Sequence, residues 1–572
     1  MRPRANATLL ARVTATVPAR LVKKLDNSPR AADTWSWSDT VVTTDSGETV
    51  TLTPEGGVVN DIGQIRCSCL LSPRCFHVLA VVAALEPDDA QTHTGASDGT
   101  TTIAPESAVA VTPEQRAIAE QARGLVGDWL IAGAAAAGAV LQGELLRVVH
   151  EARLAGAYRL AGAALRVVRG ARALREARPD FDAHDLLNDL RELGSSAHLL
   201  ATRGELSSAA VGTARREYTS IGSLRLRGIG TEPVVARGGY AGVTSYVCDE
   251  RGTIYSVSDV LPADVSRAFG AYELAIIMGD TSLSHRELTR GGLFVQNATA
   301  SGDLRLGAGK QVKAVRGNSG ARFDEPELAR LFDVPLAEQL DRAFAALSAE
   351  GELTPKSASL VFVRARVLGH GEDALVVAVD DTALAVVAAD EHPELPYREN
   401  LRLLSELVGR TLLLVAHVVP ERPRTLAAIT LQADSDALAL PETMAQRVNL
   451  GLERLKRSEL VQPTRARVDF HTGAALDPLA VLRRRLISLA LNGANSLPPE
   501  AAPRIERDRA ALHDAVMSGA ADALGALARA SFAARHARTQ GGLALAEAYV
   551  SAASYERAAT LAIRRATFLD QR

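Results

Sequence analysis

The sequence predicts a multi-domain α+β protein with a small ββα-type module, Ala-rich helical blocks and two strand-rich blocks. The chain has 572 residues, a length that corresponds to three or four domains of about 150 residues each. Hydrophobic residues make up 47% of the chain and aromatic residues only 4%, so Ala, Val and Leu must supply most of the apolar surface of its helices and strands. Three of the four cysteines fall within residues 67–75, which sets one short segment apart from the rest.

Residues 1–85 are expected to form the small module. Residues 40–44 (TVVTT) and 49–53 (TVTLT) have strand-like composition and lie on either side of a DSG turn. A third strand over residues 63–69 leads into a segment that opens a helix at Cys75. This order of strands and helix is the reason for the ββα description.

Residues 86–111 are predicted to be a flexible linker, because they are rich in Thr, Ser, Asp, Gly and Pro and carry too little apolar surface to fold. A helical block follows over residues 112–205. Its start is marked by Thr112 as cap, Pro113 at the first helical position and Gln115 at the third, which together make a capping box.

Strand signals return in two later blocks. Residues 206–350 are predicted to form a first strand-rich block with trailing helices. Residues 351–439 read as three strands, one helix and two strands, which is the order of an oligonucleotide-binding (OB)-type barrel. The alternative for both blocks is a generic mixed sheet. Residues 440–572 are predicted to form a C-terminal Ala-rich helical block.

Charge and composition exclude several classes of protein. The net charge of −3 excludes steering of the whole molecule towards a polyanion, so any nucleic-acid surface must be local. Four cysteines cannot form a disulfide scaffold. The longest apolar stretch, residues 129–141, has 13 residues, well short of the roughly 20 needed to span a bilayer. We therefore expect a cytoplasmic protein with no membrane partner.

The cysteine-rich segment has the ligands of a metal site. Cys67 and Cys69 lie two residues apart on a predicted strand, so their side chains point to the same face. Cys75 and His77 lie at the start of a helix, where the positive dipole end favours thiolates. Three thiolates and one imidazole fill a tetrahedral Zn²⁺ site and leave no position for an activated water, so the zinc is expected to be structural. The fourth cysteine, Cys248, is expected to be a small core residue.

Two alternatives to zinc remain open for this segment. One is a chance cluster of reduced cysteines beside an ordinary core histidine. The other is a redox Cys-x-Cys pair, which leaves Cys75 and His77 without a role. Ligand type and spacing favour zinc over both.

The Cys-x-Cys…Cys-x-His pattern on a strand-to-helix frame resembles the SWIM zinc finger over residues 41–85, including the apolar helix after His77. More generally, the rest of the chain resembles uncharacterised SWIM-containing proteins of high-GC bacteria. Two features depart from the family: the gap between Cys69 and Cys75 is short, and Phe76 stands where a basic residue is common. The resemblance implies zinc binding. It implies DNA or protein interaction as a class tendency, since SWIM modules occur in chromatin-remodelling-type ATPases and in transposases.

Arginines supply the candidate nucleic-acid contacts. Residues 147–178 hold eight Arg and only two acidic residues. Within that segment four arginines are spaced by three residues and spread over about half of a helix circumference. A phosphate-contacting surface is one interpretation, and a solvated helix face is the alternative. The candidate contacts, including two arginines beside the cysteines, are Arg66, Arg74, Arg166, Arg169, Arg172 and Arg175.

We therefore expect a non-enzymatic zinc-finger protein that acts as a DNA- or protein-interaction module. The alternative is a protein adaptor for an ATPase or remodeller with no nucleic-acid contact. A third hypothesis, an enzyme with its site in the strand-rich middle, has no specific motif behind it. The sequence favours no particular oligomeric state.

Overall fold

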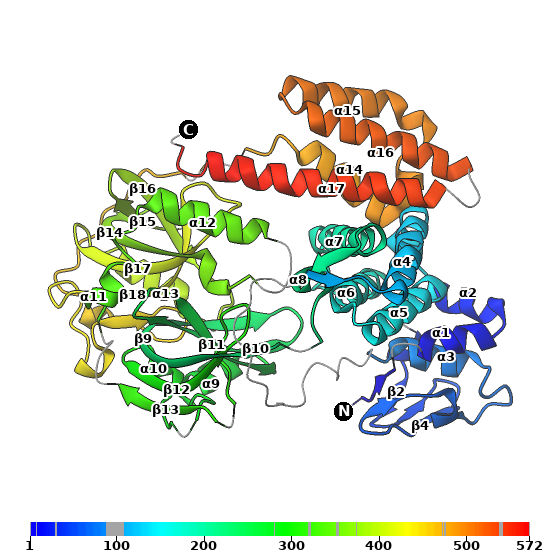
Figure 1. Cartoon of the computed structure of the whole chain (residues 1–572), viewed down its shortest axis with the longest axis horizontal. Helices are drawn as coiled ribbons and strands as arrows, with labels where there is room; N and C mark the ends of the chain where they lie inside the picture. The colour runs from blue at the N-terminus through cyan, green and yellow to red at the C-terminus, as the bar shows by residue number, and fades with distance from the viewer. Residues whose placement is uncertain are drawn as a thin grey trace. The chain divides into compact units, whose positions relative to one another are not determined.

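The structure is a computed structural model with helices and strands in several separate sheets (Figure 1), which confirms the predicted α+β multi-domain class. It describes residues 2–6, 9–28, 31–86, 108–214, 216–279, 281–309, 311–317, 322–349, 354–372, 374–471, 473, 476–536 and 541–570. The chain divides into two compact units. The first, here called the helical unit, contains the described residues of segments 1–95, 106–215 and 477–558. The second, the β-rich unit, contains those of segments 216–476 and 559–572.

The N-terminal part of the helical unit holds the cysteine-rich segment. Its main sheet is antiparallel in the order β2-β3-β4-β6, and helix α3 follows the last strand. The bounds are β2 Ser36–Ser38, β3 Val41–Thr43, β4 Thr49–Leu52, β6 Ile65–Cys67 and α3 Phe76–Ala84. Alternation along the strands buries Val42, Val50 and Ile65, and α3 buries a continuous apolar run over residues 78–82. These two apolar surfaces form the core of the module.

The structure adds elements in this part of the chain that the sequence did not predict. They are the strand pair β1 (Arg4–Ala5) with β5 (Val58–Val59), and helices α1 (Leu9–Thr16) and α2 (Ala19–Asn27). Leu9 and Val13 of α1 are fully buried. Both helices are therefore held by packing rather than by their length.

Most of the predicted linker, residues 87–107, lies outside the described residues. At its end the chain forms β7 (Ala108–Ala110), which pairs antiparallel with β8 (Glu205–Ser207). The helical block then starts at the predicted capping box: Thr112 Oγ1 accepts the Gln115 N–H at 3.2 Å, and the Gln115 side chain accepts the Thr112 N–H at 3.1 Å.

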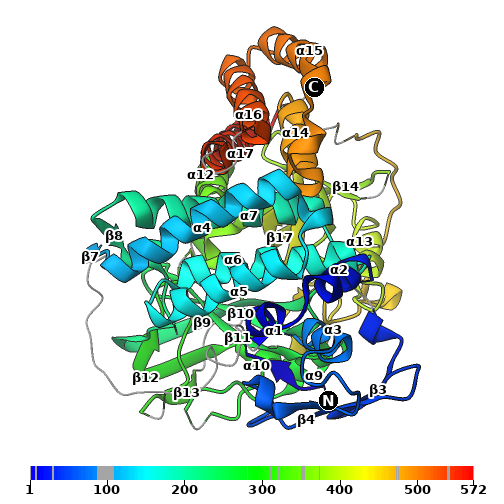
Figure 2. The same cartoon turned by 90° about the vertical axis from the view of Figure 1, so that its right-hand side faces the viewer.

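Eight longer helices of the helical unit pack through small residues. Those of the central block lie side by side (Figure 2): α4 Pro113–Ala132, α5 Ala139–Leu154, α6 Tyr158–Arg175 and α7 Ala183–Thr202. Those near the C-terminus are α14 Ala480–Asn492, α15 Ala502–Asp514, α16 Ser518–His536 and α17 Gly541–Ala566, of which the part up to Ala558 belongs to this unit. A Cβ added to Gly127 would lie 2.4 Å from the Gly542 carbonyl oxygen, and one added to Gly194 would lie 2.2 Å from a Val550 methyl. Only glycine allows these approaches.

The C-terminal block departs from the sequence prediction at its start. Residues 447–449, predicted to lie in a helical block, form strand β19, which pairs antiparallel with β18 (Thr425–Ala433). All three residues of β19 are buried, so tertiary pairing outweighs the local helical pattern. The next α-helix, α14, begins only at Ala480.

The first strand-rich block forms an antiparallel sheet in the order β11-β10-β9-β12-β13. The bounds are β9 Thr219–Ala236, β10 Tyr240–Asp249, β11 Ile254–Pro262, β12 Gly292–Ala300 and β13 Lys313–Gly317. Helices α9 (Ser266–Glu273) and α10 (His285–Leu288) lie between β11 and β12 in the sequence.

The second strand-rich block has the predicted order of three strands, one helix and two strands. The elements are β14 Leu360–His370, β15 Leu375–Val379, β16 Thr382–Ala388, α13 Tyr397–Leu404, β17 Thr411–Val418 and β18. The pairings lead from β14 through β15, β16, β18 and β17 back to β14, with β16 and β18 parallel. This circuit is compatible with the OB-type order, and the barrel stays a prediction.

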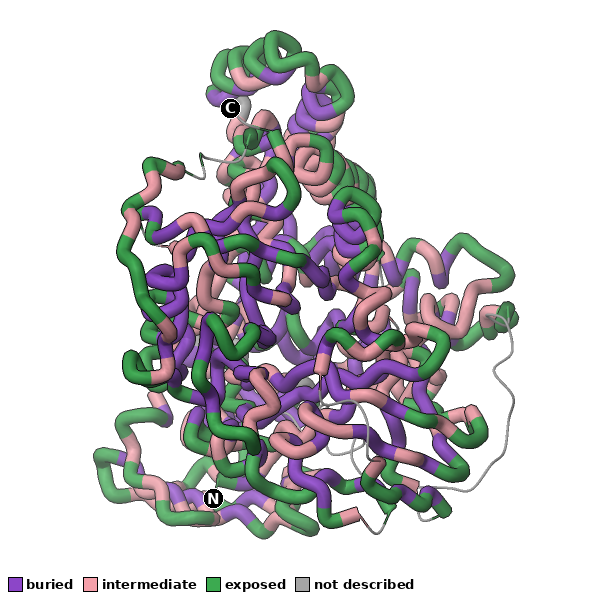
Figure 3. The backbone as a smooth tube through the Cα atoms, turned by 90° about the vertical axis from the view of Figure 1, so that its left-hand side faces the viewer, coloured by how far each residue is buried: buried purple, intermediate pink, exposed green. Residues whose placement is uncertain are grey.

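The two sheets of the β-rich unit share a core. Alternate residues of β14, such as Val361 and Val363, face one hydrophobic cluster. Phe362 faces a second cluster, which also contains Tyr246 and Cys248 of β10. Cys248 is completely buried there, as expected of a small core residue. Figure 3 shows runs of buried residues along the chain, and every residue of β18 is buried.

Candidate metal centre

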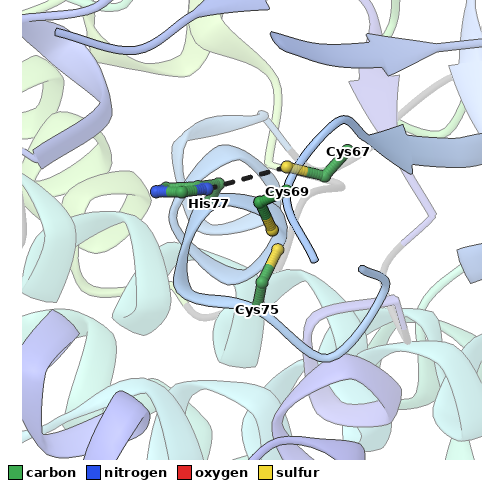
Figure 4. A group of neighbouring side chains, drawn as sticks. All are labelled: Cys67, Cys69, Cys75 and His77. Carbon is green, nitrogen blue, oxygen red and sulfur yellow. Dashed lines mark hydrogen bonds between the residues drawn. The ribbon is translucent and has the colours of Figure 1, made fainter. Parts of the chain in front are cut away.

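The structure brings the four predicted ligands together (Figure 4). The three sulfurs and one imidazole nitrogen all lie within 4.8 Å of one another. Cys67 ends β6, Cys69 lies in the following turn, and Cys75 and His77 lie at the N-terminus of α3. Sulfurs in a tetrahedral zinc site with 2.3 Å bonds are about 3.8 Å apart, so the cluster needs to contract by no more than about 1 Å to hold one ion.

The orientation of His77 identifies its ligand atom. Cys67 Sγ lies 3.6 Å from His77 Nδ1. The other ring nitrogen points away from the sulfurs (Figure 4). Nδ1 is therefore the atom that would bind the metal.

Backbone hydrogen bonds hold the segment that carries Cys67 and Cys69. Cys67 pairs with Val50 across the sheet, and the next residue, Ser68, exchanges hydrogen bonds with Thr49. The Ser72 hydroxyl accepts the Cys67 N–H at 3.1 Å, and the Ser72 N–H donates to the Cys69 carbonyl at 3.2 Å. These bonds close the turn over residues 69–72 and attach its last residue to Cys67 at the end of β6.

The helix start holds the other two ligands. Cys75 is the N-cap of α3, and its sulfur accepts the Val78 N–H at 3.5 Å. An unpaired helical N–H and the helix dipole both stabilise negative charge on this sulfur. The buried face of α3 anchors the helix in the core, so the positions of Cys75 and His77 are set by packing.

The thiols differ in how easily they ionise. Burial raises the pKa of Cys67 to about 12 and also raises the pKa of Cys75. Burial opposes ionisation of Cys69 too, but hydrogen bonds from the two other thiols and from the Leu71 and Ser72 N–H groups lower its pKa. Cys69 is therefore the thiol that ionises most readily, and a bound cation would favour the thiolate form of all three.

Aromatic side chains surround His77. The Trp35 ring lies edge-on at 5.7 Å from the His77 ring and 6.4 Å from the Phe76 ring. Lys24 of α2 places its Nζ 4.3 Å from the centre of the Phe76 ring. Sequence reasoning missed Trp35 and Lys24, although a tryptophan just before the first strand is conspicuous in a chain with only three.

Two of the candidate arginines lie beside the metal ligands and four lie on helix α6. Arg66 and Arg74, beside the ligands, are exposed. Arg166 forms an ion pair with Asp189 at 2.8 Å. Arg172 donates to the Leu85 carbonyl at 3.1 Å and to Gln142 at 3.3 Å.

Burial lowers the pKa of Arg172, whose hydrogen bond to Leu85 attaches α6 to the end of α3. Arg169 is exposed and Arg175 is half-buried. Because Arg166 and Arg172 are engaged within the chain, the geometry gives their predicted nucleic-acid contacts no support. Those contacts stay a prediction for the whole group.

A polar cluster in the β-rich unit has the residue types of a hydrolase triad. His417 Nε2 lies 3.1 Å from Glu232 Oε2, and His417 Nδ1 lies 2.9 Å from Ser359 Oγ. The Ser359 hydroxyl, however, donates to the Lys356 carbonyl at 2.8 Å, so it can only accept from the histidine. An imidazole that donates to the serine cannot act as its base. This cluster therefore gives no support to an enzyme in the strand-rich middle.

Comparisons with known proteins assign no relative. No family model, no curated protein and no solved structure matches the chain. Within the described part of the chain, no helix combines the length and hydropathy needed to cross a membrane. The Cys67, Cys69, Cys75 and His77 cluster, which could hold one metal ion, is therefore the feature on which a function can be based.

Proposed function

We propose that the N-terminal part of the helical unit is a SWIM-type zinc finger with one structural Zn²⁺. The observation that carries this proposal is the approach of four ligand atoms from a strand, a turn and a helix start to within 4.8 Å. Three sulfurs and one imidazole match zinc better than magnesium or calcium, which prefer oxygen ligands. With four protein ligands the ion is closed to substrate, so its role is to fix the fold.

We further propose that this finger is a non-enzymatic interaction module of a cytoplasmic protein. Its reduced cysteines suit a reducing compartment. A metal that joins β6, the following turn and α3 fixes the side chains exposed around it, and a fixed surface binds a partner at a lower entropic cost.

DNA is the first candidate partner. Arg66 and Arg74 are exposed beside the ligands, and both could contact phosphates. Phe76 replaces the basic residue that is common in SWIM fingers, but the Lys24 ammonium over its ring supplies a positive charge at the same place. The half-exposed Trp35 and Phe76 rings would suit base stacking on a single strand.

A protein partner, such as an ATPase or remodeller, is the second candidate. The observation that favours it is the exposure of two consecutive leucines, Leu70 and Leu71, in the turn beside the metal ligands. Leucines contribute little to phosphate contacts, whereas exposed apolar patches mark protein interfaces.

The zinc proposal is tested by metal analysis of the purified full chain. We expect one zinc per chain in the wild type and a large loss of zinc in Cys67→Ser and in Cys75→Ser. The control is Cys248→Ser, which changes a buried cysteine of the β-rich unit. Wild-type stoichiometry in both ligand variants would refute the site.

The DNA version is tested by titration with single- and double-stranded DNA at two salt concentrations. Affinity through phosphate contacts should fall steeply with salt, because bound counterions are released. The double variant R66Q/R74Q should weaken binding, and R454Q, an exposed arginine of the β-rich unit, should not. A signal that is absent or independent of salt excludes nucleic acid as the partner.

A further inference from the structure

Leu70 and Leu71 are exposed to a degree that the fold does not explain. Their exposures are 103% and 63%, and they occupy the two central positions of the turn that runs from Cys69 to Ser72. Turns favour Gly, Pro, Asn, Asp and Ser at such positions. Leu70 buries no apolar surface there and Leu71 buries little, so the two leucines contribute little to the stability of the module.

Hydrogen bonds tie this turn to the two ligand residues Cys67 and Cys69. The Ser72 N–H donates to the Cys69 carbonyl at 3.2 Å. The Ser72 side chain in turn accepts the Cys67 N–H. Because these hydrogen bonds hold the turn against Cys67 and Cys69, the turn presents both leucine side chains to solvent in a fixed arrangement.

The charged side chains of the sequence segment that carries the leucines have one sign. Arg66 precedes the turn and Arg74 follows it, and both are exposed. No Asp or Glu occurs between Asp61 and Glu86. Among the described residues neither guanidinium is paired with a carboxylate.

We propose that Arg66, Leu70, Leu71 and Arg74, here called the knuckle surface, dock a segment of a protein partner that combines acidic and apolar side chains. The inference rests on the proposed function, and it names the partner class of that module. The leucines enter an apolar groove or meet apolar side chains of the partner, and the two arginines pair with its carboxylates.

Charge complementarity favours a short acidic segment over an extended polyanion. A segment of a few residues meets only the local positive charge of the knuckle surface. DNA or an anionic membrane extends over a much larger area and also meets the rest of a chain whose net charge is −3. The phosphates of DNA moreover leave both leucines without a partner.

The test is a selection of phage-displayed 12-residue peptides on the zinc-loaded full chain. We expect enrichment of sequences that contain Asp or Glu together with Leu, Ile or Phe. A selected peptide, labelled with fluorescein, should bind L70S/L71S and R66Q/R74Q at least tenfold more weakly than the wild type. Enrichment of other sequences, or equal binding to L70S/L71S, overturns the proposal.

Matched controls separate docking from folding. L154S/L261S removes two other exposed leucines, at the end of α5 and in β11, and should bind the peptide as the wild type does. L70S/L71S should keep its zinc and its circular dichroism spectrum, because neither leucine is buried. If L154S/L261S weakens binding as much as L70S/L71S, the knuckle surface is not the docking site.

Two further probes test whether DNA or an anionic membrane binds the knuckle surface instead of a peptide. They are a 20-base-pair DNA duplex and vesicles of equal parts phosphatidylcholine and phosphatidylserine. If either binds the wild type and loses affinity with L70S/L71S while no acidic-apolar peptide is selected, the docking proposal is overturned. The zinc content of the wild-type chain tells the failure of one proposal from the failure of the other. If the chain holds zinc but selects no acidic-apolar peptide, only the docking proposal is refuted. If the chain holds no zinc, the zinc-finger proposal is refuted.

Discussion

His417 of β17 and Glu232 of β9 form a largely buried ion pair between the two sheets of the β-rich unit. Burial opposes the charge on His417, but the Glu232 carboxylate and the Ser359 hydrogen bond raise its pKa. Burial likewise opposes the charge on Glu232, whose pKa is nevertheless lowered by His417 and by the Tyr246 hydroxyl. Neither partner could be identified from the sequence, because 185 positions separate them and no local pattern marks the pair.

This pair predicts a pH dependence of stability. A raised histidine pKa contributes stability that is full below the unfolded value of 6.5 and is lost as the pH rises through the folded value. The lowered glutamate pKa contributes stability that is full above the unfolded value of 4.5 and is lost as the pH falls through the folded value. The contribution of the pair is therefore complete between pH 4.5 and 6.5.

We expect His417→Gln to destabilise the β-rich unit by about 2 kcal/mol at pH 6, the value of a hydrogen bond to a charged group, and by less at pH 9. The measurement is hydrogen exchange of β14 and β17 at the two pH values, corrected for the intrinsic exchange rate. His471→Gln, at an exposed histidine, is the control and should change nothing. An equal effect of His417→Gln at both pH values would show that the imidazole carries no charge.

The sequence predicted those helices and strands that are determined by residues close to one another along the chain. The order of three strands, a helix and two strands in the second block and the capping box at Thr112 both recur in the structure. Helices α1 and α2 were not predicted, because they have only eight and nine residues and are held by packing in the helical unit. Strand β19 was predicted as helix, because its partner β18 precedes it by more than ten residues.

The metal ligands were predictable for the same reason, because they lie close together in the sequence. The four lie within eleven residues, so spacing along a strand, a turn and a helix start was enough to predict their convergence. Trp35 and Lys24, which lie more than thirty residues before the ligands, reach His77 and Phe76 only through the tertiary fold. Their contribution could not be read from the local pattern.

The capping box at the start of α4 leads to a prediction about the stability of that helix. Thr112→Ala removes the acceptor of the Gln115 N–H at the start of α4 and should cost about 1 kcal/mol of helix stability. Exchange of the first-turn amides of α4 should rise several-fold, with little change in the last turn. Thr202→Ala, at an exposed threonine at the end of α7, serves as the control. Unchanged exchange in the first turn would mean that β7 and β8, rather than the cap, hold this end of α4.

At the scale of the whole molecule, the metal ligands and the elements that carry them all belong to the helical unit. The core around the ligands is small and is formed by one face of a four-stranded sheet, by α3, and by α1 and α2, which pack on α3. Small cores of this kind commonly depend on a metal for stability. The β-rich unit has separate hydrophobic clusters and contains none of the ligands.

Removal of the metal should therefore act on one part of the chain. We expect a chelator such as 1,10-phenanthroline to raise hydrogen exchange strongly in β4, β6 and α3, because binding of structural zinc contributes on the order of 10 kcal/mol to such folds. A smaller rise is expected in α6, which is tied to the end of α3 through Arg172 and Leu85. Strands β14 to β18 should keep their protection, which serves as the internal control. If protection falls equally in both units, or in neither, there is no structural metal at Cys67, Cys69, Cys75 and His77. If the loss of protection is confined to the module, the ion holds together the surface that is proposed to bind partners.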